Sequence, residues 1–100
     1  MKSFNQLHQE TSALQLDFLL TDLKAASTFL DIAETTQNSV TRARNIHNAN
    51  VAHDAVQHFL PRVQMSEQDN TDVQGKLDLL KERILTFEFP PTSPGEEFAA

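Results

Sequence analysis

Three of the four histidines fall within residues 45–63, NIHNANVAHDAVQHFLPRV, together with a single aspartate. They are His47, His53 and His58, and the aspartate is Asp54. Imidazole and carboxylate side chains bind transition metals and also act as general acids and bases. This histidine segment is therefore the first candidate for a metal site or a catalytic site.

The spacing of these side chains limits what they can do together. On a helix, His47, Asp54 and His58 share one face, whereas His53 borders the apolar side. Asp54 and His58 lie about one turn apart, but His47 and His58 are about 16 Å apart along the axis. One metal ion, with ligand bonds of about 2 Å, cannot span that distance. We therefore expect a solvated face with a weak Asp54–His58 pair, no metal site and no cofactor.

Arg42 and His47, in RARNIH, have the spacing R-x4-H. This pattern resembles the R-x4-6-H motif of HEPN-type helical ribonucleases, which cleave RNA across a dimer without a metal ion. The resemblance covers six residues. It implies that Arg42 stabilises the phosphate and that His47 acts as the acid or base. The net charge of −6 argues against an RNA substrate, because phosphate binding needs a basic surface.

Other reactive arrangements are excluded by composition. The chain has no cysteine, which removes a disulfide framework, a thiolate metal site and a cysteine nucleophile. Its two glycines, Gly75 and Gly95, are too few and too far apart for a phosphate loop or a dinucleotide fingerprint. We expect no catalysis by this chain and see no sign of a small-molecule substrate.

Composition indicates one small, acidic domain. A chain of 100 residues with 39% apolar residues can fold alone, but its core is modest and oligomerisation would help it. The first residues lack the apolar stretch of a signal peptide, and no segment is apolar enough to span a membrane. We expect a soluble, cytoplasmic protein. Residues 36–65 carry +2, flanked by segments of −3 and −5, which suits three helices packed side by side.

Helical periodicity dominates, and it predicts an all-α, up-down-up three-helix bundle, or a helical hairpin plus a third helix. The helices are expected at about 13–35, 39–63 and 71–87, within a domain of residues 12–88. Ser12 and Gln15 have the spacing of a capping box, Asn38 or Ser39 would cap the second helix, and Asn70 or Thr71 the third. Residues 1–11 are expected to be a flexible N-terminus, and residues 89–100 a Pro-rich tail.

Two of the predicted helices carry a single apolar stripe each. Each of these two helices also contains one residue that disfavours a regular helix. Gly75 would weaken the first turn of the third helix, and Pro61 would kink the second helix or end it one turn early. The second-helix stripe consists of Ile46, Ala49, Ala52, Val56, Phe59, Leu60 and Val63, and the third-helix stripe of Val73, Leu77, Leu80, Ile84 and Phe87.

The first helix has more apolar surface than one stripe. An alternative is a break near Thr21-Asp22, because such pairs also start helices. One apolar arc contains Leu16, Leu19, Leu20, Leu23, Ala26, Leu30 and Ala33, and a second contains Leu14, Phe18, Ala25, Phe29 and Ile32. We expect the first arc to face the chain's own helices and the second to be an interface.

The surplus apolar arc leads to a functional expectation. Large exposed apolar patches are rare on monomers, so a second copy or a partner helix should cover this arc, with the C-terminal tail as another candidate cover. We expect a helical protein–protein interaction module, a homodimer or bound to a partner helix, with the HEPN-like ribonuclease as the alternative.

Overall fold

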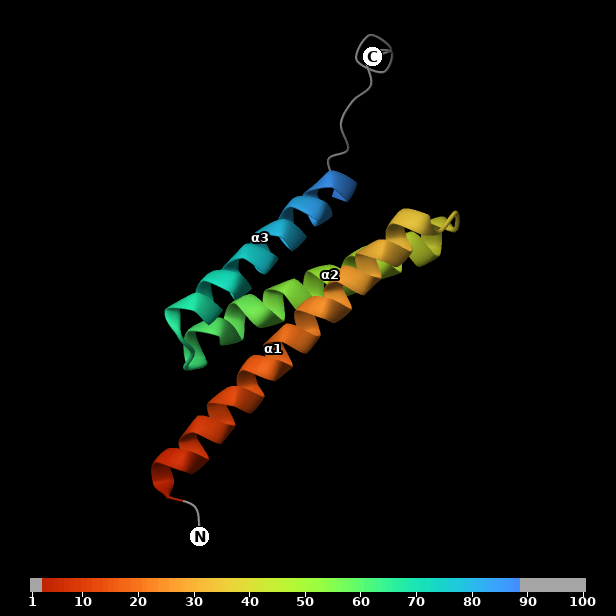
Figure 1. Ribbon diagram of the computed structural model, residues 1–100. Helices are drawn as coiled ribbons and strands as arrows, with labels where there is room; N and C mark the ends of the chain where they lie inside the picture. The colour runs from red at the N-terminus through yellow and green to blue at the C-terminus, as the bar shows by residue number, and fades with distance from the viewer. Residues whose placement is uncertain (1–2, 89–100) are drawn as a thin grey trace.

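The computed structural model describes the backbone of residues 3–88 and the side chains of residue 3, residue 6 and residues 11–88. Over this range the chain forms α1 (Phe4–Thr35), α2 (Ser39–Phe59), a 3-10 turn η1 (Leu60–Arg62) and α3 (Glu67–Glu88). Figure 1 shows α1, α2 and α3 running up, down and up. The all-α three-helix fold expected from the periodicity is confirmed, and the tail predicted at residues 89–100 lies outside the described residues.

Helix α1 begins at Phe4, well before the predicted start, so the start at Ser12 is wrong and the backbone of residues 4–11 is helical. The sequence contains two serines followed three residues later by glutamine, and the structure uses the earlier one. Ser3 Oγ accepts from the Gln6 backbone N–H at 3.2 Å, and the Ser3 N–H donates to Gln6 Oε1 at 3.0 Å. No glycine or proline lies between the two motifs, so the helix runs through the second one. It is also continuous through Thr21.

Helix α2 starts where the sequence predicted and ends earlier. Asn38 Oδ1 accepts hydrogen bonds from the backbone N–H groups of Val40 and Thr41, at 2.9 and 3.0 Å. The α-helix stops at Phe59 rather than near Val63, and η1 carries Pro61. The proline ring has no N–H and clashes with the preceding turn, which explains the early end.

Helix α3 begins four residues before the predicted start at residue 71, so residues 67–70, which the prediction left between two helices, are helical. Ser66 Oγ accepts from the Asp69 N–H at 3.1 Å, and Glu67 and Asp69 lie in the first turn. Carboxylates there are favoured by the positive end of the helix dipole. Gly75 therefore lies inside α3 and not in its first turn.

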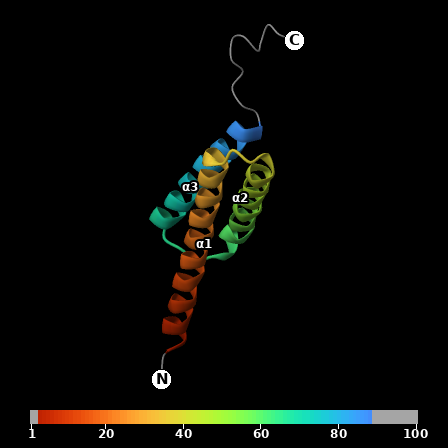
Figure 2. The same ribbon diagram turned by 90° about the vertical axis from the view of Figure 1, so that its right-hand side faces the viewer.

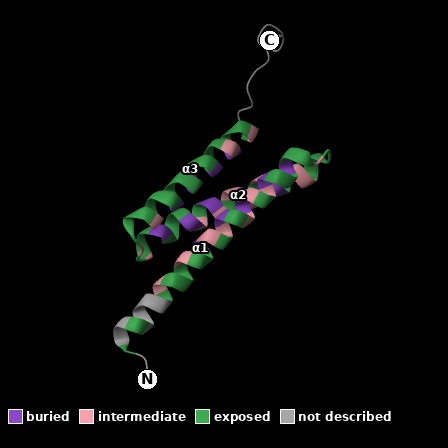
Figure 3. Cartoon of the chain, viewed as in Figure 1, coloured by how far each residue is buried: buried purple, intermediate pink, exposed green. Residues whose placement is uncertain are grey.

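The helices pack unevenly. Helix α1 contacts α2 far more extensively than either helix contacts α3. Figures 1 and 2 both show the N-terminal part of α1 extending beyond the hairpin formed by α2 and α3. Burial agrees with this picture, because the described residues in the N-terminal part of α1 are exposed or intermediate in Figure 3. Leu19 is the first buried residue of α1 among those described. No described helix is long and apolar enough to cross a membrane.

The core consists of one stripe from each helix. The α3 stripe is as predicted, with Val73, Leu77, Leu80 and Ile84 buried and Phe87 partly buried. The α1 contribution lies on the first apolar arc, which therefore faces the chain's own helices as expected. The buried apolar residues of the whole core are Leu19, Leu23, Ala26, Leu30, Ala33, Ala49, Val56, Leu60, Val73, Leu77, Leu80 and Ile84.

The α2 stripe is rotated relative to the prediction. Phe59 was expected in the core, but it is 45% exposed, because α2 ends there and the chain turns into η1. Asn45 and His53 are buried instead. Each satisfies its polar atoms locally: Asn45 Nδ2 donates to the Thr41 carbonyl at 2.8 Å, and His53 Nδ1 lies 3.2 Å from an Asp54 oxygen.

Candidate functional site

The three histidines of the segment lie in different surroundings. His47 and His58 are exposed, as the helical wheel predicted, and His53 is almost fully buried. The prediction of a pair between Asp54 and His58 is wrong, because the Asp54 carboxylate contacts the ring of its neighbour His53 instead. The His58 ring instead meets Phe59 edge-on, with ring centroids 5.2 Å apart. Among the described residues, no three His, Asp or Glu side chains are grouped so that they could hold a metal ion.

Arg42 is occupied by the turn between α1 and α2. Its Nε donates to the Ala33 carbonyl at 3.1 Å, and its terminal nitrogen donates to the Thr36 carbonyl at 2.6 Å. The last carbonyl groups of a helix lack partners within it, so a guanidinium there satisfies them and also suits the negative end of the dipole. His47 is exposed on α2. The geometry of Arg42 thus has a structural cause that requires no substrate.

Among the described residues, nothing covers an apolar strip on the outward side of α1. It contains residues spaced alternately four and three apart, which we call the α1 seam: Leu14, Phe18, Thr21, Ala25, Thr28, Ile32 and Thr35. Leu14 is 70% exposed, Phe18 61% and Ile32 39%. The seam lies roughly 150° around α1 from the buried stripe, so neither α2 nor α3 covers it.

Of the five interface residues that the sequence predicted, four lie on the seam and one does not. Phe29 is partly buried, packs against the core and borders a shallow hollow lined by α2 residues such as Val51 and Ala52. The four on the seam are Leu14, Phe18, Ala25 and Ile32.

The threonines of the seam hide their polar groups. The hydroxyls of Thr21, Thr28 and Thr35 each donate to the carbonyl four residues earlier, at 2.9, 3.1 and 3.0 Å. A hydroxyl bonded in this way needs no water partner for its proton, and the methyl group remains to contact a neighbour. The seam is therefore less polar than its composition indicates.

At the Leu14 end, the seam continues onto the end of α2. Leu14 and Phe18 line a hollow of about 490 Å³ together with Phe59 and Val63. The Arg62 guanidinium lies 5.9 Å from the centre of the Phe59 ring. Exposure of Phe59, which the sequence did not predict, thus enlarges the apolar surface beside Phe18.

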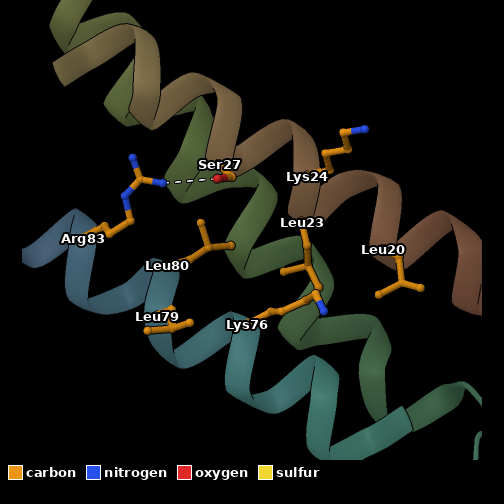
Figure 4. Close-up of a pocket in the computed structure, with 8 residues that line it drawn as sticks. All are labelled: Leu20, Leu23, Lys24, Ser27, Lys76, Leu79, Leu80 and Arg83. Carbon is orange, nitrogen blue, oxygen red and sulfur yellow. Dashed lines mark hydrogen bonds between the residues drawn. The ribbon is translucent and has the colours of Figure 1, made fainter. Parts of the chain in front are cut away.

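A second candidate surface lies between α1 and α3. It is a groove of about 610 Å³. Figure 4 shows leucine side chains from both helices lining it. Leu79, on its α3 wall, is 63% exposed. Lys24 and Lys76, which also line the groove, are exposed, and the Lys24 amine points away from α3 (Figure 4). The groove is lined by Leu20, Leu23, Lys24, Ser27, Lys76, Leu79, Leu80 and Arg83.

Arg83 joins α1 to α3 at one end of the groove. Its guanidinium donates to Ser27 Oγ at 3.1 Å, to Asp31 at 2.8 Å and to Glu34 at 2.9 Å. Burial of the guanidinium opposes its charge, but the hydrogen bonds and charges of Glu34 and Asp31 outweigh this and raise the Arg83 pKa above its ordinary value. Arg83 is therefore held by partners from α1, whereas Lys24 and Lys76 have no ion pair among the described residues.

The sequence did not reveal this groove. It requires α3 to lie beside α1, and Leu79 falls outside the single stripe that predicted the α3 core. One available signal was charge complementarity, since Asp31 and Glu34 are acidic positions one turn apart that can both face an arginine.

Compared with known proteins, the chain matches no protein-family model, no curated protein and no solved structure.

Proposed function

We propose that this chain is a small helical interaction module that forms a homodimer through the α1 seam and has no catalytic activity of its own. The observation that carries the proposal is the exposure of Leu14 and Phe18, at 70% and 61%, on a strip that continues onto Phe59. Contiguous exposed apolar surface of this kind marks interaction sites. The proposal includes a cytoplasmic location, which the absence of cysteine permits.

The small core supports the same proposal. A chain of this size buries a limited fraction of its surface, and much of α1 packs against nothing within the described chain. An isolated helix of 12–15 residues is marginal in water, so the projecting part of α1 gains from a neighbour. A second copy would supply one, and two-fold dimers are the commonest soluble oligomers.

Sedimentation equilibrium at micromolar concentration tests the proposal. We expect a mass near twice the chain mass of 11.3 kDa, falling to the chain mass for Phe18→Glu, because a carboxylate cannot be buried unpaired in the seam. Leu79→Glu is the matched control, since Leu79 is similarly exposed but lies in the α1–α3 groove. A wild-type mass of 11.3 kDa would contradict the proposal, and loss of the dimer only with Leu79→Glu would move the interface to the groove.

The ribonuclease alternative has its own test. Arg42 already bonds two carbonyl groups of the α1 end, which gives its position a structural explanation and supports a non-catalytic chain. We expect purified protein to leave single-stranded RNA intact. Cleavage that disappears with His47→Ala, a change at an exposed position, would overturn this and favour the HEPN-like reading.

The groove favours a second kind of partner. We propose that it accepts an acidic amphipathic helix, because a leucine-lined floor is bordered by the exposed Lys76, which has no carboxylate partner among the described residues. A synthetic helical peptide with leucines on one face and glutamates on the other should bind, as measured by fluorescence anisotropy. Lys76→Glu should weaken binding more than Lys81→Glu, an exposed α3 change outside the groove. Equal effects of the two variants would reject this site.

A further inference from the structure

We infer that the two copies of the dimer pair their α1 helices antiparallel, with Asp17 of each copy beside Lys24 of the other. The inference rests on the proposed self-association through the α1 seam and adds its direction and register. It follows from the spacing of the seam, the length of α1, the sizes of the seam residues and the charges beside them.

The seam has the repeat of a coiled coil. Its members, from Leu14 to Thr35, are separated by four, three, four, three, four and three residues without a break, which spans three heptads. This repeat keeps one strip of a helix facing a partner over its whole length. The outward side of α1 is therefore suited to a straight helix partner, rather than to a loop or a flat sheet.

The length of α1 selects a register. Helix α1 runs from Phe4 to Thr35, so its midpoint lies between Leu19 and Leu20. When two such helices pair antiparallel over their full length, Phe18 lies opposite Thr21 and Leu14 opposite Ala25. Four of the seven seam residues, Leu14, Phe18, Thr21 and Ala25, therefore meet one another at the centre of the arrangement with the longest overlap. The remaining three lie opposite positions 4, 7 and 11, which continue the same spacing toward the start of α1.

This register also alternates large and small side chains. Phe18 against Thr21 and Leu14 against Ala25 each place a bulky group opposite a small one, which fills space evenly along the interface. A parallel pair in register would place Phe18 against its own copy and Ala25 against its own copy. Two phenylalanine rings would then crowd one level of the interface, and two alanines would leave a cavity at another. Crowding and cavities both destabilise a packed interface.

The charges beside the seam favour the same direction. Asp17 and Lys24 are exposed and directly precede the seam residues Phe18 and Ala25. In the antiparallel register Asp17 of one copy lies beside Lys24 of the other, and the two-fold axis makes this pair twice. A parallel pair would instead bring Asp17 next to Asp22 of the second copy, also twice, and like charges there repel.

The rest of the fold leaves room for this pairing. The buried stripe of α1, including Leu23 and Leu30, faces α2 and α3 on the other side from the seam. Figures 1 and 2 show both helices on that side, with the N-terminal part of α1 projecting beyond them. In the antiparallel dimer this projecting part of each copy lies along the C-terminal part of the other α1.

Distances between spin labels determine the direction. The chain has no native cysteine, so Thr35→Cys and Gln15→Cys can each be labelled at one site. The antiparallel register separates the two labels at position 35 by about 46 Å along the axis and those at position 15 by about 14 Å. A parallel pair gives equal, short distances at both positions, close to the interaxial spacing of about 8–10 Å. Gln15 is exposed, and each labelled variant is first checked for dimer mass.

Charge reversal determines the register. Asp17→Lys should weaken dimerisation on the order of tenfold, because it faces Lys24 of the other copy twice. The double variant Asp17→Lys with Lys24→Asp should recover wild-type affinity, whereas Asp17→Lys with Lys81→Asp, which has the same net charge, should not. Equal short label distances, or no recovery in the first double variant, would overturn the antiparallel register while leaving the proposed dimer intact. A monomeric wild-type chain would instead overturn the proposed function itself.

Discussion

Arg42 shows how a side chain whose sequence context suggests catalysis can instead make structural contacts. Its spacing from His47 resembles a ribonuclease motif, yet its guanidinium bonds the carbonyl groups of Ala33 and Thr36. It thereby links the end of α1 to the start of α2. Whether an arginine binds a phosphate or a helix end depends on which acceptors the fold brings near it, and a linear motif does not contain that information.

Arg42→Ala should lower the free energy of unfolding by about 1–2 kcal/mol, because it removes two charge-assisted hydrogen bonds at a partly buried helix end. Urea denaturation followed by circular dichroism would measure the change. Arg44→Ala is the control: Arg44 is exposed on the same helix, and its loss should change stability by less than about 0.5 kcal/mol. Equal losses for the two variants would mean that the Arg42 contacts contribute nothing.

At the scale of the elements, α3 is the helix that its sequence describes best. Its four buried residues, Val73, Leu77, Leu80 and Ile84, repeat at steps of four, three and four. A single narrow stripe is enough because α3 packs against the other two helices along one side only. Helix α1 differs in that it is apolar on two sides, and its sequence alone does not say which side is covered.

Leu80→Ala should cost about 2–5 kcal/mol, a large share of the stability of a domain this small. Leu80 is 5% exposed within the core, whereas its neighbour Leu79 is 63% exposed. A thermal melt of Leu80→Ala should therefore shift strongly downward, and that of Leu79→Ala should stay near wild type. Similar shifts for both would place the two residues in equivalent environments, contrary to the structure.

Gly75→Ala should stabilise α3 by about 0.5–1 kcal/mol. Gly75 lies inside the helix without a positive φ angle, and a β-carbon added there would meet nothing within 4 Å. Alanine loses less backbone entropy than glycine when the helix forms, so the gain has no steric cost to offset it. The melting temperature should rise by a few degrees, and a decrease would show that position 75 is not in an open part of the helix.

At the scale of the whole molecule, folding and association are linked. If the α1 seam binds a second copy only in the folded state, dilution reduces the stability of the native protein. The melting temperature of the wild-type chain should therefore rise with protein concentration. Phe18→Glu should remove this dependence and Leu79→Glu should retain it. A wild-type melting temperature that is independent of concentration would indicate a monomer over the range measured.

Local sequence patterns were sufficient for the helical class, the loop before α2, the Asn38 cap and the α3 stripe, because each depends on residues within a few positions of one another. They also identified α1 as the helix with surplus apolar surface and placed Leu14, Phe18, Ala25 and Ile32 together, since a helix of known pitch determines which residues share a face. The start of α1 was beyond such reasoning, because Ser3 and Ser12 offer the same cap and only the stability of the longer helix chooses between them.

The tertiary structure decided how the helix faces are used. Burial of His53 and Asn45 and the partial burial of Phe29 depend on how α1 and α2 pack against each other, which no local pattern contains. The α1–α3 groove likewise requires α3 to lie beside α1, where Arg83 bonds Ser27, Asp31 and Glu34, more than forty positions away along the chain. Such contacts are set by packing in space, so sequence spacing could indicate which faces are apolar but not which of them remain uncovered.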